Sequence, residues 1–278
     1  MDTMPDLGDR PRDDEIMAQH YAIRAEEAEK MSFIGDKEPL SSLAAEYESG
    51  NAIFKKKIEK LGETYGALRR TRGDGNCFFR AFMFSYLENL LETRNEAEAG
   101  RVKDSVDKCK QSLLDLGHSE FTFEDFLASF TDQLDGVQDG SLSADQLVEN
   151  SRDQSISDSV VMFFRFITSG EIRKRADFFE PFIVGTSGLS VQQFCRSSVE
   201  PMGEESDHVH ITALSDALGV LIRIVYLDSS NGDGGNNLDV NFHDFIPGQC
   251  VQEQPILKSK PSVVLLYRPG HYDILYEK

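Results

Sequence analysis

A glycine-rich turn and a strongly apolar helix adjoin in residues 73–92, which read GDGNCFFRAFMFSYLENLLE. Large apolar side chains form a wide stripe along this predicted helix, and further phenylalanines lie outside the stripe. We therefore expect a central helix that is buried on most sides. Cys77 stands at the junction, where the helix dipole and the N–H groups of the first turn favour a thiolate. The same N–H groups could hold an oxyanion, so the segment offers a nucleophile and its oxyanion hole together.

Cys77 also has a purely structural interpretation. Free cysteines are commonly small, inert, buried hydrophobes, and Asp-Gly is a common turn dipeptide. The turn and the helix alone therefore leave catalysis and simple burial both open.

A second segment, GHYDILY at residues 270–276, offers a base for the thiol. Alternate residues of a strand share a face, so His271 and Asp273 should lie side by side. A carboxylate beside an imidazole fixes its tautomer and stabilises the imidazolium, which is the pairing that a thiol nucleophile needs. An early cysteine on a helix and a late histidine on a strand follow the papain-like order. Incidental polar residues on a solvated strand edge are the alternative.

The remaining cysteines and histidines give weaker signals. Cys109 and Cys195 lie in helical patterns and are expected in the core, whereas Cys250 lies in a polar loop. Asp207 and His208 begin a predicted helix, where capping by Ser206 or Asp207 is the plainer interpretation and substrate contact is the alternative. The chain has no C-x-x-C pair and no zinc-ligand spacing, so we expect no metal and no other cofactor.

Composition restricts the partners. The 48 acidic and 29 basic residues give a formal charge of −19, which repels nucleic acid and favours a basic protein surface; a simple gain in solubility is the alternative. Neither a signal peptide nor a run long enough to cross a bilayer is visible, so we expect no membrane association. Four unpaired-looking cysteines suit a reducing, intracellular compartment, and we expect a cytoplasmic protein that could also occupy the nucleus.

The elements expected along the chain change from helices to strands. Residues 1–12 should be disordered and 13–30 helical. A helix over 51–70, a largely helical block over 100–200 with caps at Ser143 and Ser190, and a helix over 208–218 ended by Gly219 should follow. Strands are expected at 220–227, 262–268 and 271–276, the last two as an antiparallel hairpin, with a long loop over 228–260.

Three segments together resemble a known family. RTRGDGNCFFRAF (70–82), VEPMGEESDHVHITAL (199–214) and LLYRPGHYDILY (265–276) are similar to motifs of the ovarian-tumour (OTU) deubiquitinases, and within them of the otubains. The extended N-terminus, DEIMAQHYAIRAEE (14–27), resembles the arm of the otubain-1 type. Two departures are Gly73, where the family pattern has proline, and Gly203, where it has cysteine.

The resemblance implies a fold, an activity and a set of site residues. It implies a papain-like α/β (α+β) fold, helix-rich, with a small and largely antiparallel central sheet, divided into an N-terminal arm (1–40) and an OTU catalytic domain (41–278). Cys77 matches the nucleophile, His271 the base, Asp273 the residue that orients it and Asp74 an active-site residue near the oxyanion hole. Asp207 and His208 are the expected substrate contacts.

The activity implied is hydrolysis of ubiquitin–lysine isopeptide bonds, in the polyubiquitin chains that signal proteasomal degradation. Ubiquitin and polyubiquitin would then be the partners, together with ubiquitin-conjugating enzymes, for a protein expected to be monomeric. The alternative is a non-catalytic inhibitor that blocks ubiquitin-charged conjugating enzymes through the N-terminal arm.

Overall fold

The structure, a computed structural model, describes residues 26, 30–47, 52–229, 240–248 and 260–278. The segments expected to be disordered (1–12) and helical (13–30) therefore lie outside the described residues, apart from Glu26 and Lys30. Cys250 lies outside them as well.

A six-stranded sheet forms the centre of the molecule, with strand order β1-β2-β6-β5-β3-β4. All neighbouring strands pair antiparallel except β3 and β5, which are parallel, so the expectation of a largely antiparallel sheet is confirmed. The predicted hairpin is present as β5 followed by β6. The strands are β1 (Ile34–Pro39), β2 (Tyr65–Thr71), β3 (Ile222–Tyr226), β4 (Phe242–Phe245), β5 (Val263–Arg268) and β6 (His271–Glu277).

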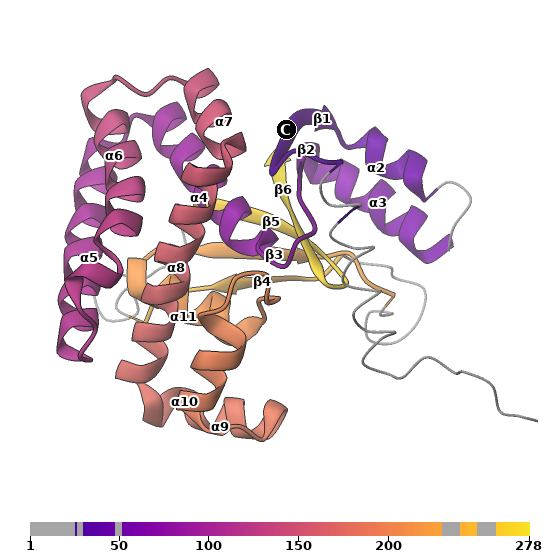
Figure 1. Ribbon diagram of the computed structural model, residues 1–278. Coiled ribbons are helices and arrows are strands. Elements are labelled where there is room, and N and C mark those ends of the chain that lie inside the picture. The colour runs from indigo at the N-terminus through magenta and orange to yellow at the C-terminus, as the bar shows by residue number, and fades with distance from the viewer. Residues whose placement is uncertain (1–25, 27–29, 48–51, 230–239, 249–259) are drawn as a thin grey trace, which may run out of the picture.

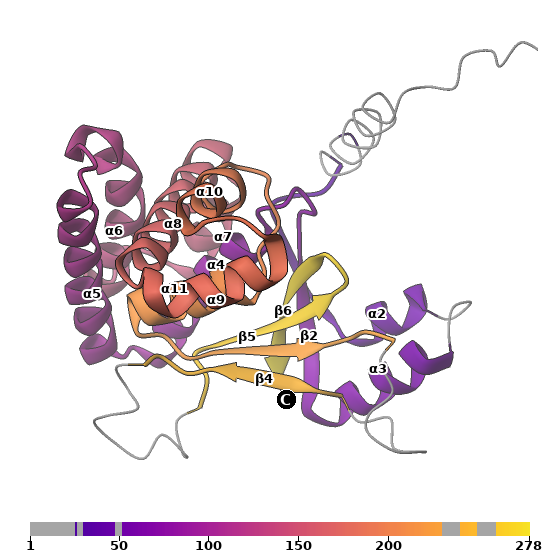
Figure 2. The same ribbon diagram turned by 90° about the horizontal axis from the view of Figure 1, so that it is seen from below.

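Helices cover both faces of this sheet, and most of them lie on one side (Figures 1 and 2). Successive side chains of a strand point to opposite faces of the sheet, so each strand contributes to a core on either face. Leu265 and Ile274 join the larger core, while Leu266 and Leu275 join the smaller one. The smaller core is completed by α2 (Ser41–Glu46) and α3 (Ala52–Thr64). The large side carries α4 (Cys77–Thr93), α5 (Glu96–Asp115), η1 (Glu120–Thr122), α6 (Glu124–Asp139), α7 (Ala144–Arg152), α8 (Gln154–Lys174), α9 (Ala176–Ser187), α10 (Val191–Phe194), η2 (Cys195–Val199) and α11 (His208–Leu218).

The central helix predicted after Cys77 is α4, and its side chains are buried on nearly all sides. Three other local signals are also confirmed. Ser143 and Ser190 each close a capping box at the start of α7 and α10, and Gly219 follows α11 in the left-handed conformation.

Three sequence-based boundaries differ from the structure. The helix expected over 51–70 ends at Thr64, and residues 65–71 form β2, because hydrogen bonding to both β1 and β6 outweighs the helical spacing of the apolar residues. The loop expected over 228–260 contains β4, which is stabilised by pairing with β3. Strand β1 pairs with β2 and so belongs to the sheet, although it falls within the segment 1–40 assigned to the arm.

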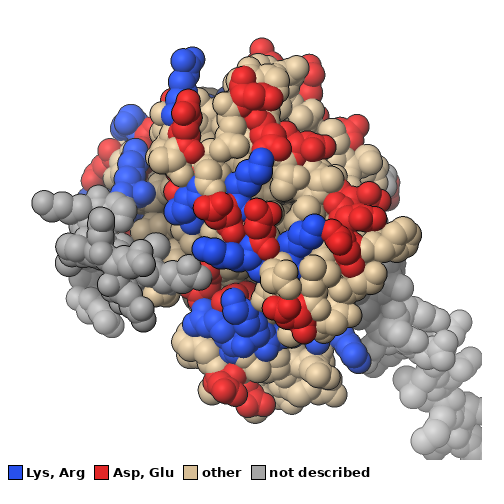
Figure 3. All heavy atoms as spheres, turned by 90° about the vertical axis from the view of Figure 1, so that its left-hand side faces the viewer, with Lys and Arg blue, Asp and Glu red and all other residues tan. Residues whose placement is uncertain are grey.

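Acidic and basic side chains are interspersed on the face that carries α5 and α6 (Figure 3). Ion pairs of these elements include Lys103 of α5 with Asp135 of α6 and Lys110 of α5 with Glu120 of η1. None of the described helices is long and apolar enough to cross a membrane.

Candidate active site

The fold brings the N-terminus of α4 against the start of β6. Phe78 and Tyr272, the residues that follow Cys77 and His271, have ring centroids 5.5 Å apart. Cys77 itself is buried, with 4% of its surface exposed, while 18% of the His271 side chain is exposed. The two candidates, far apart in sequence, therefore meet at one end of the central helix.

Asp273 lies beside His271, as strand alternation predicts. His271 Nε2 is 2.9 Å from Asp273 Oδ1, so Nδ1 is the ring nitrogen left for the nucleophile turn. A Cβ placed on Gly73 would lie 3.7 Å from that Nδ1 atom, which puts the ring directly over the turn. The arrangement orients an imidazole toward a thiol.

The electrostatics favour a protonated His271. Burial of the ring opposes the charged form, but the hydrogen bond to Asp273 and the interaction with Cys77 outweigh it and raise the pKa of His271 to about 9. An imidazolium at neutral pH stabilises a neighbouring thiolate and can donate its proton to a leaving group.

Asp273 is fully buried and yet remains an anion. Burial alone would raise the pKa of its carboxyl, but His271, Arg268 and the backbone N–H of Thr71 together hold that pKa below its usual value. Thr71 N donates to Oδ1 over 3.0 Å, and Arg268 Nη2 donates to Oδ2 over 2.6 Å. Both carboxylate oxygens are thus fixed from three strands.

Asp74 shapes the turn before Cys77. Its Oδ1 accepts from Asn76 N over 3.0 Å, and its Oδ2 pairs with the buried Arg80. The Asp74 N–H donates to Arg72 O. In the described part of the chain, the N–H groups of Gly75 and Cys77 have no acceptor, so they are the free donors of this turn.

Gly75 permits a close approach of the turn to a second loop. Its φ is +81°, and a Cβ there would lie 1.8 Å from Gly203 O.

Gly75→Ala should therefore destabilise the fold by more than about 2 kcal/mol and abolish hydrolysis, because the backbone of one loop must move. Thermal unfolding and activity assays measure both effects.

Gly140 supplies the control for this substitution. Its φ is +76°, and no atom lies within 4 Å of the Cβ position. Gly140→Ala should cost about 1–2 kcal/mol from backbone strain alone and leave hydrolysis intact. Equal effects of the two substitutions would contradict a special role for the contact between the loops.

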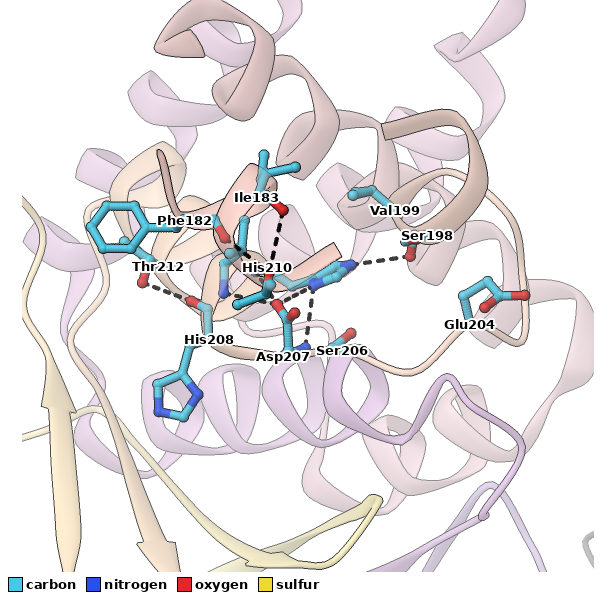
Figure 4. Close-up of polar contacts among 12 residues, drawn as sticks. Phe182, Ile183, Ser198, Val199, Glu204, Ser206, Asp207, His208, His210 and Thr212 are labelled. Carbon is cyan, nitrogen blue, oxygen red and sulfur yellow. Dashed lines mark hydrogen bonds and ion pairs between the residues drawn. The ribbon is translucent and has the colours of Figure 1, made fainter. Parts of the chain in front are cut away.

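The predicted substrate contacts, Asp207 and His208, lie at the start of α11 (Figure 4). Asp207 caps α11, accepting from Val209 N over 2.8 Å, and contacts the buried His210. The capping interpretation of Asp207 is therefore confirmed. His208 is exposed, points away from that cluster and contacts Tyr226 Oη through Nε2 at 2.9 Å. Its role toward substrate stays a prediction.

Three arginines of the site were not found from the sequence: Arg80 and Arg165, which are fully buried, and Arg268, which is partly exposed. Arg80 and Arg165 are held by acceptors from distant segments, such as Asp158 and Asn76. Arg268 is held by Asp273, five residues further along the same hairpin. The only sequence signal for Arg268 was its place in the motif LLYRPGHYDILY, three residues before His271. Among the described residues, no cluster of three or more His, Cys, Asp or Glu side chains could bind a metal ion.

This fold and this site define a cysteine peptidase of papain-like arrangement, with a helix-borne thiol and a strand-borne histidine and aspartate. Residues 26–277 match the family described as Peptidase C65 Otubain. The chain therefore belongs to the otubain family.

Named relatives support the same assignment. The chain is 61% identical over 260 residues to the OVARIAN TUMOR DOMAIN-containing deubiquitinating enzyme 1 of Arabidopsis thaliana, covering 92% of this chain and 85% of that protein. It is 43% identical over 265 residues to the Ubiquitin thioesterase OTUB1 of Homo sapiens, covering 95% and 90%. A solved complex of h/ceOTUB1 with ubiquitin aldehyde and UBC13~Ub gives a TM-score of 0.81 at 33% identity, covering 96% of this chain and 98% of that one. The predicted enzyme class, a cysteine-type deubiquitinase, is confirmed.

Proposed function

We propose that this protein hydrolyses the isopeptide bond between the C-terminus of ubiquitin and a lysine side chain. The observation that carries the proposal is the placement of Cys77 beside a His271 that is hydrogen-bonded to a buried Asp273. A thiolate–imidazolium pair of this kind is suited to acyl transfer from an amide to water.

Acylation begins with attack of the Cys77 thiolate on the isopeptide carbonyl carbon. A C–S bond forms, and the tetrahedral oxyanion would be held by the N–H groups of Gly75 and Cys77. His271 donates its proton to the lysine nitrogen as the C–N bond breaks. The lysine amine leaves, and ubiquitin remains bound to Cys77 as a thioester.

Deacylation reverses the direction of proton transfer. Neutral His271 takes a proton from a water molecule, which attacks the thioester carbonyl. The C–S bond breaks and restores the Cys77 thiolate beside a protonated His271. The new C-terminal carboxyl group of ubiquitin then loses its proton to solvent. Asp273 keeps the ring oriented through both steps and stabilises its charged form.

Ubiquitin, polyubiquitin and ubiquitin-charged conjugating enzymes are the partners of the proposed function. The neighbouring solved structures support this assignment, since they hold OTUB1 with ubiquitin aldehyde and with UBC13~Ub or UBCH5B~Ub. We place the substrate among the polyubiquitin chains that signal proteasomal degradation, and the protein in the cytoplasm with access to the nucleus.

Non-catalytic inhibition through the N-terminal arm is the less favoured alternative. The relatives are named for thioesterase or deubiquitinating activity. The arm residues that would carry inhibition lie almost entirely outside the described part of the chain.

A panel of substrates tests the proposal. Purified protein should release monoubiquitin from isopeptide-linked diubiquitin while leaving unfolded casein undigested, since the proposed substrate is ubiquitin and not ordinary peptide. Gel electrophoresis of time courses measures both reactions. Digestion of casein with intact diubiquitin would instead indicate a general papain-like protease.

A further inference from the structure

Arg165 is a fully buried arginine in the middle of α8, with 0% of its surface exposed. Its guanidinium carbon lies 4.9 Å from the centre of the Phe79 ring, which belongs to the first turn of the catalytic helix. In the described part of the chain, no carboxylate oxygen lies within ion-pair distance of it. Desolvating a guanidinium without a contacting anion is unfavourable, so a compensating set of acceptors is required.

The acceptors come from the two loops that meet at the active site. Arg165 Nη2 donates to Asn76 Oδ1 over 2.7 Å, to Glu204 O over 2.7 Å and to Gly75 O over 3.3 Å. Nη1 donates to Val199 O over 2.9 Å. One side chain thus joins the turn before the nucleophile to the segment 199–204.

Asn76 strengthens the same junction. It is 5% exposed, and its Oδ1 accepts a second hydrogen bond, from Gly203 N over 2.9 Å. Because Gly75 packs against Gly203 O with no room for a Cβ, the two loops cannot slide past each other while these bonds hold. The contact fixes the turn that precedes Cys77.

A second arginine anchors the other end of the turn to the same helix. Arg80 from α4 pairs with Asp74 and also binds Ser157 Oγ over 3.0 Å and Asp158 Oδ1 over 2.6 Å. Both of these partners belong to α8. The turn at 74–76 is therefore held to α8 at both ends, and its free N–H groups at Gly75 and Cys77 have a fixed direction.

We propose that Arg165 is a positioning residue for hydrolysis: it holds the Gly75–Asn76 turn so that its N–H groups face the developing oxyanion. The inference rests on the proposed isopeptidase function. Arg165 does not touch the reacting atoms. Burial lowers its pKa to about 10, against the raising influence of Glu204 and Asp74, so it is charged at neutral pH and can donate all of these bonds.

Arg165→Met and Arg165→Lys test this role on a ubiquitin amide with a fluorogenic leaving group. Loss of oxyanion positioning should lower kcat about 10²–10³-fold in Arg165→Met with little change in KM. Affinity for ubiquitin with a C-terminal aldehyde should fall in parallel, because its hemithioacetal oxygen occupies the oxyanion position. Alkylation of Cys77 by iodoacetamide needs no oxyanion hole and should stay within a few-fold of wild type. Arg165→Lys keeps the positive charge but lacks the two planar NH₂ groups of the guanidinium, so it should recover only part of the wild-type kcat.

Ile167→Ala is the matched control for lost stability. Ile167 is buried on the same helix, 2% exposed, and belongs to the main core. At a temperature where both variants are folded by circular dichroism, it should retain wild-type kcat. If Ile167→Ala lowers kcat as much as Arg165→Met does, or if alkylation falls together with kcat, the positioning role is wrong.

Asn76→Ala keeps the test decisive if the arginine variants do not fold. It removes the shared acceptor but leaves Arg165 its bonds to Val199 and Glu204, and it should also lower kcat and aldehyde affinity together. Wild-type kcat in Asn76→Ala would overturn the inference alone. An inactive wild-type chain would overturn the proposed function and this inference with it.

Discussion

Replacing Cys77 with serine is expected to lower the hydrolysis of isopeptide-linked diubiquitin by about 10⁴-fold or more. A serine hydroxyl beside His271 stays protonated at neutral pH, so the charged nucleophile is lost, and an activated nucleophile supplies most of the acceleration in acyl transfer. The measurement is the initial rate of monoubiquitin release. Cleavage by Cys77→Ser at the wild-type rate would rule out the proposed mechanism.

A ubiquitin electrophile separates Cys77 from the other cysteines. Burial raises the pKa of Cys109 to about 12, and burial also raises that of Cys195, so both should remain unlabelled thiols. Mass spectrometry of labelled wild type should find one ubiquitin adduct, at Cys77. Cys109→Ser is the control and should label and cleave as wild type does. An adduct retained in Cys77→Ser would place the nucleophile elsewhere.

Asp273→Asn is expected to lower kcat/KM at neutral pH by about 10²–10⁴-fold and to shift its pH dependence. Asp273 accepts hydrogen bonds on both oxygens, from Thr71 and His271 on one and from Arg268 on the other. Asparagine has one acceptor oxygen, so its amide NH₂ must face a donor on one side. The imidazole then loses its anion and its fixed orientation.

The direction of the pH shift follows from the pKa of His271. The wild-type value of about 9 means that the imidazolium needed to protonate the leaving amine is present below pH 9 and lost above it, so kcat/KM should fall as the pH rises through about 9. Removing the Asp273 charge lowers that pKa, and the alkaline limb should move down by about 1–3 pH units.

Asp36→Asn is the matched control for the Asp273 variant. Asp36 pairs with Arg152 at the surface, with 89% of its side chain exposed, and its loss should leave the profile unchanged. An alkaline limb at the same pH in Asp273→Asn and wild type would show that Asp273 does not set the proton affinity of His271.

Local sequence signals predicted the candidate nucleophile and base better than the strands and arginines that surround them. Cys77 at a helix start and His271 two residues before Asp273 could be identified because helix dipoles and strand alternation act over a few residues. The capping residues Ser143 and Ser190 were predictable for the same reason. Strand β2 was predicted as helix because Leu61, Tyr65 and Leu68 continue the spacing of three and four residues that the preceding helix shows.

The sequence by itself predicted the nucleophile and the base, and it determined the buried central helix and the family. Tertiary structure alone decided that 65–71 is a strand, because two partner strands satisfy its backbone groups. It alone decided that Arg80 and Arg165 are buried, since their acceptors Asp158 and Glu204 come from segments far away in the chain. An arginine in an isolated helix or strand gives no sign of burial, because burying its charge becomes possible only where the fold collects enough acceptors around it.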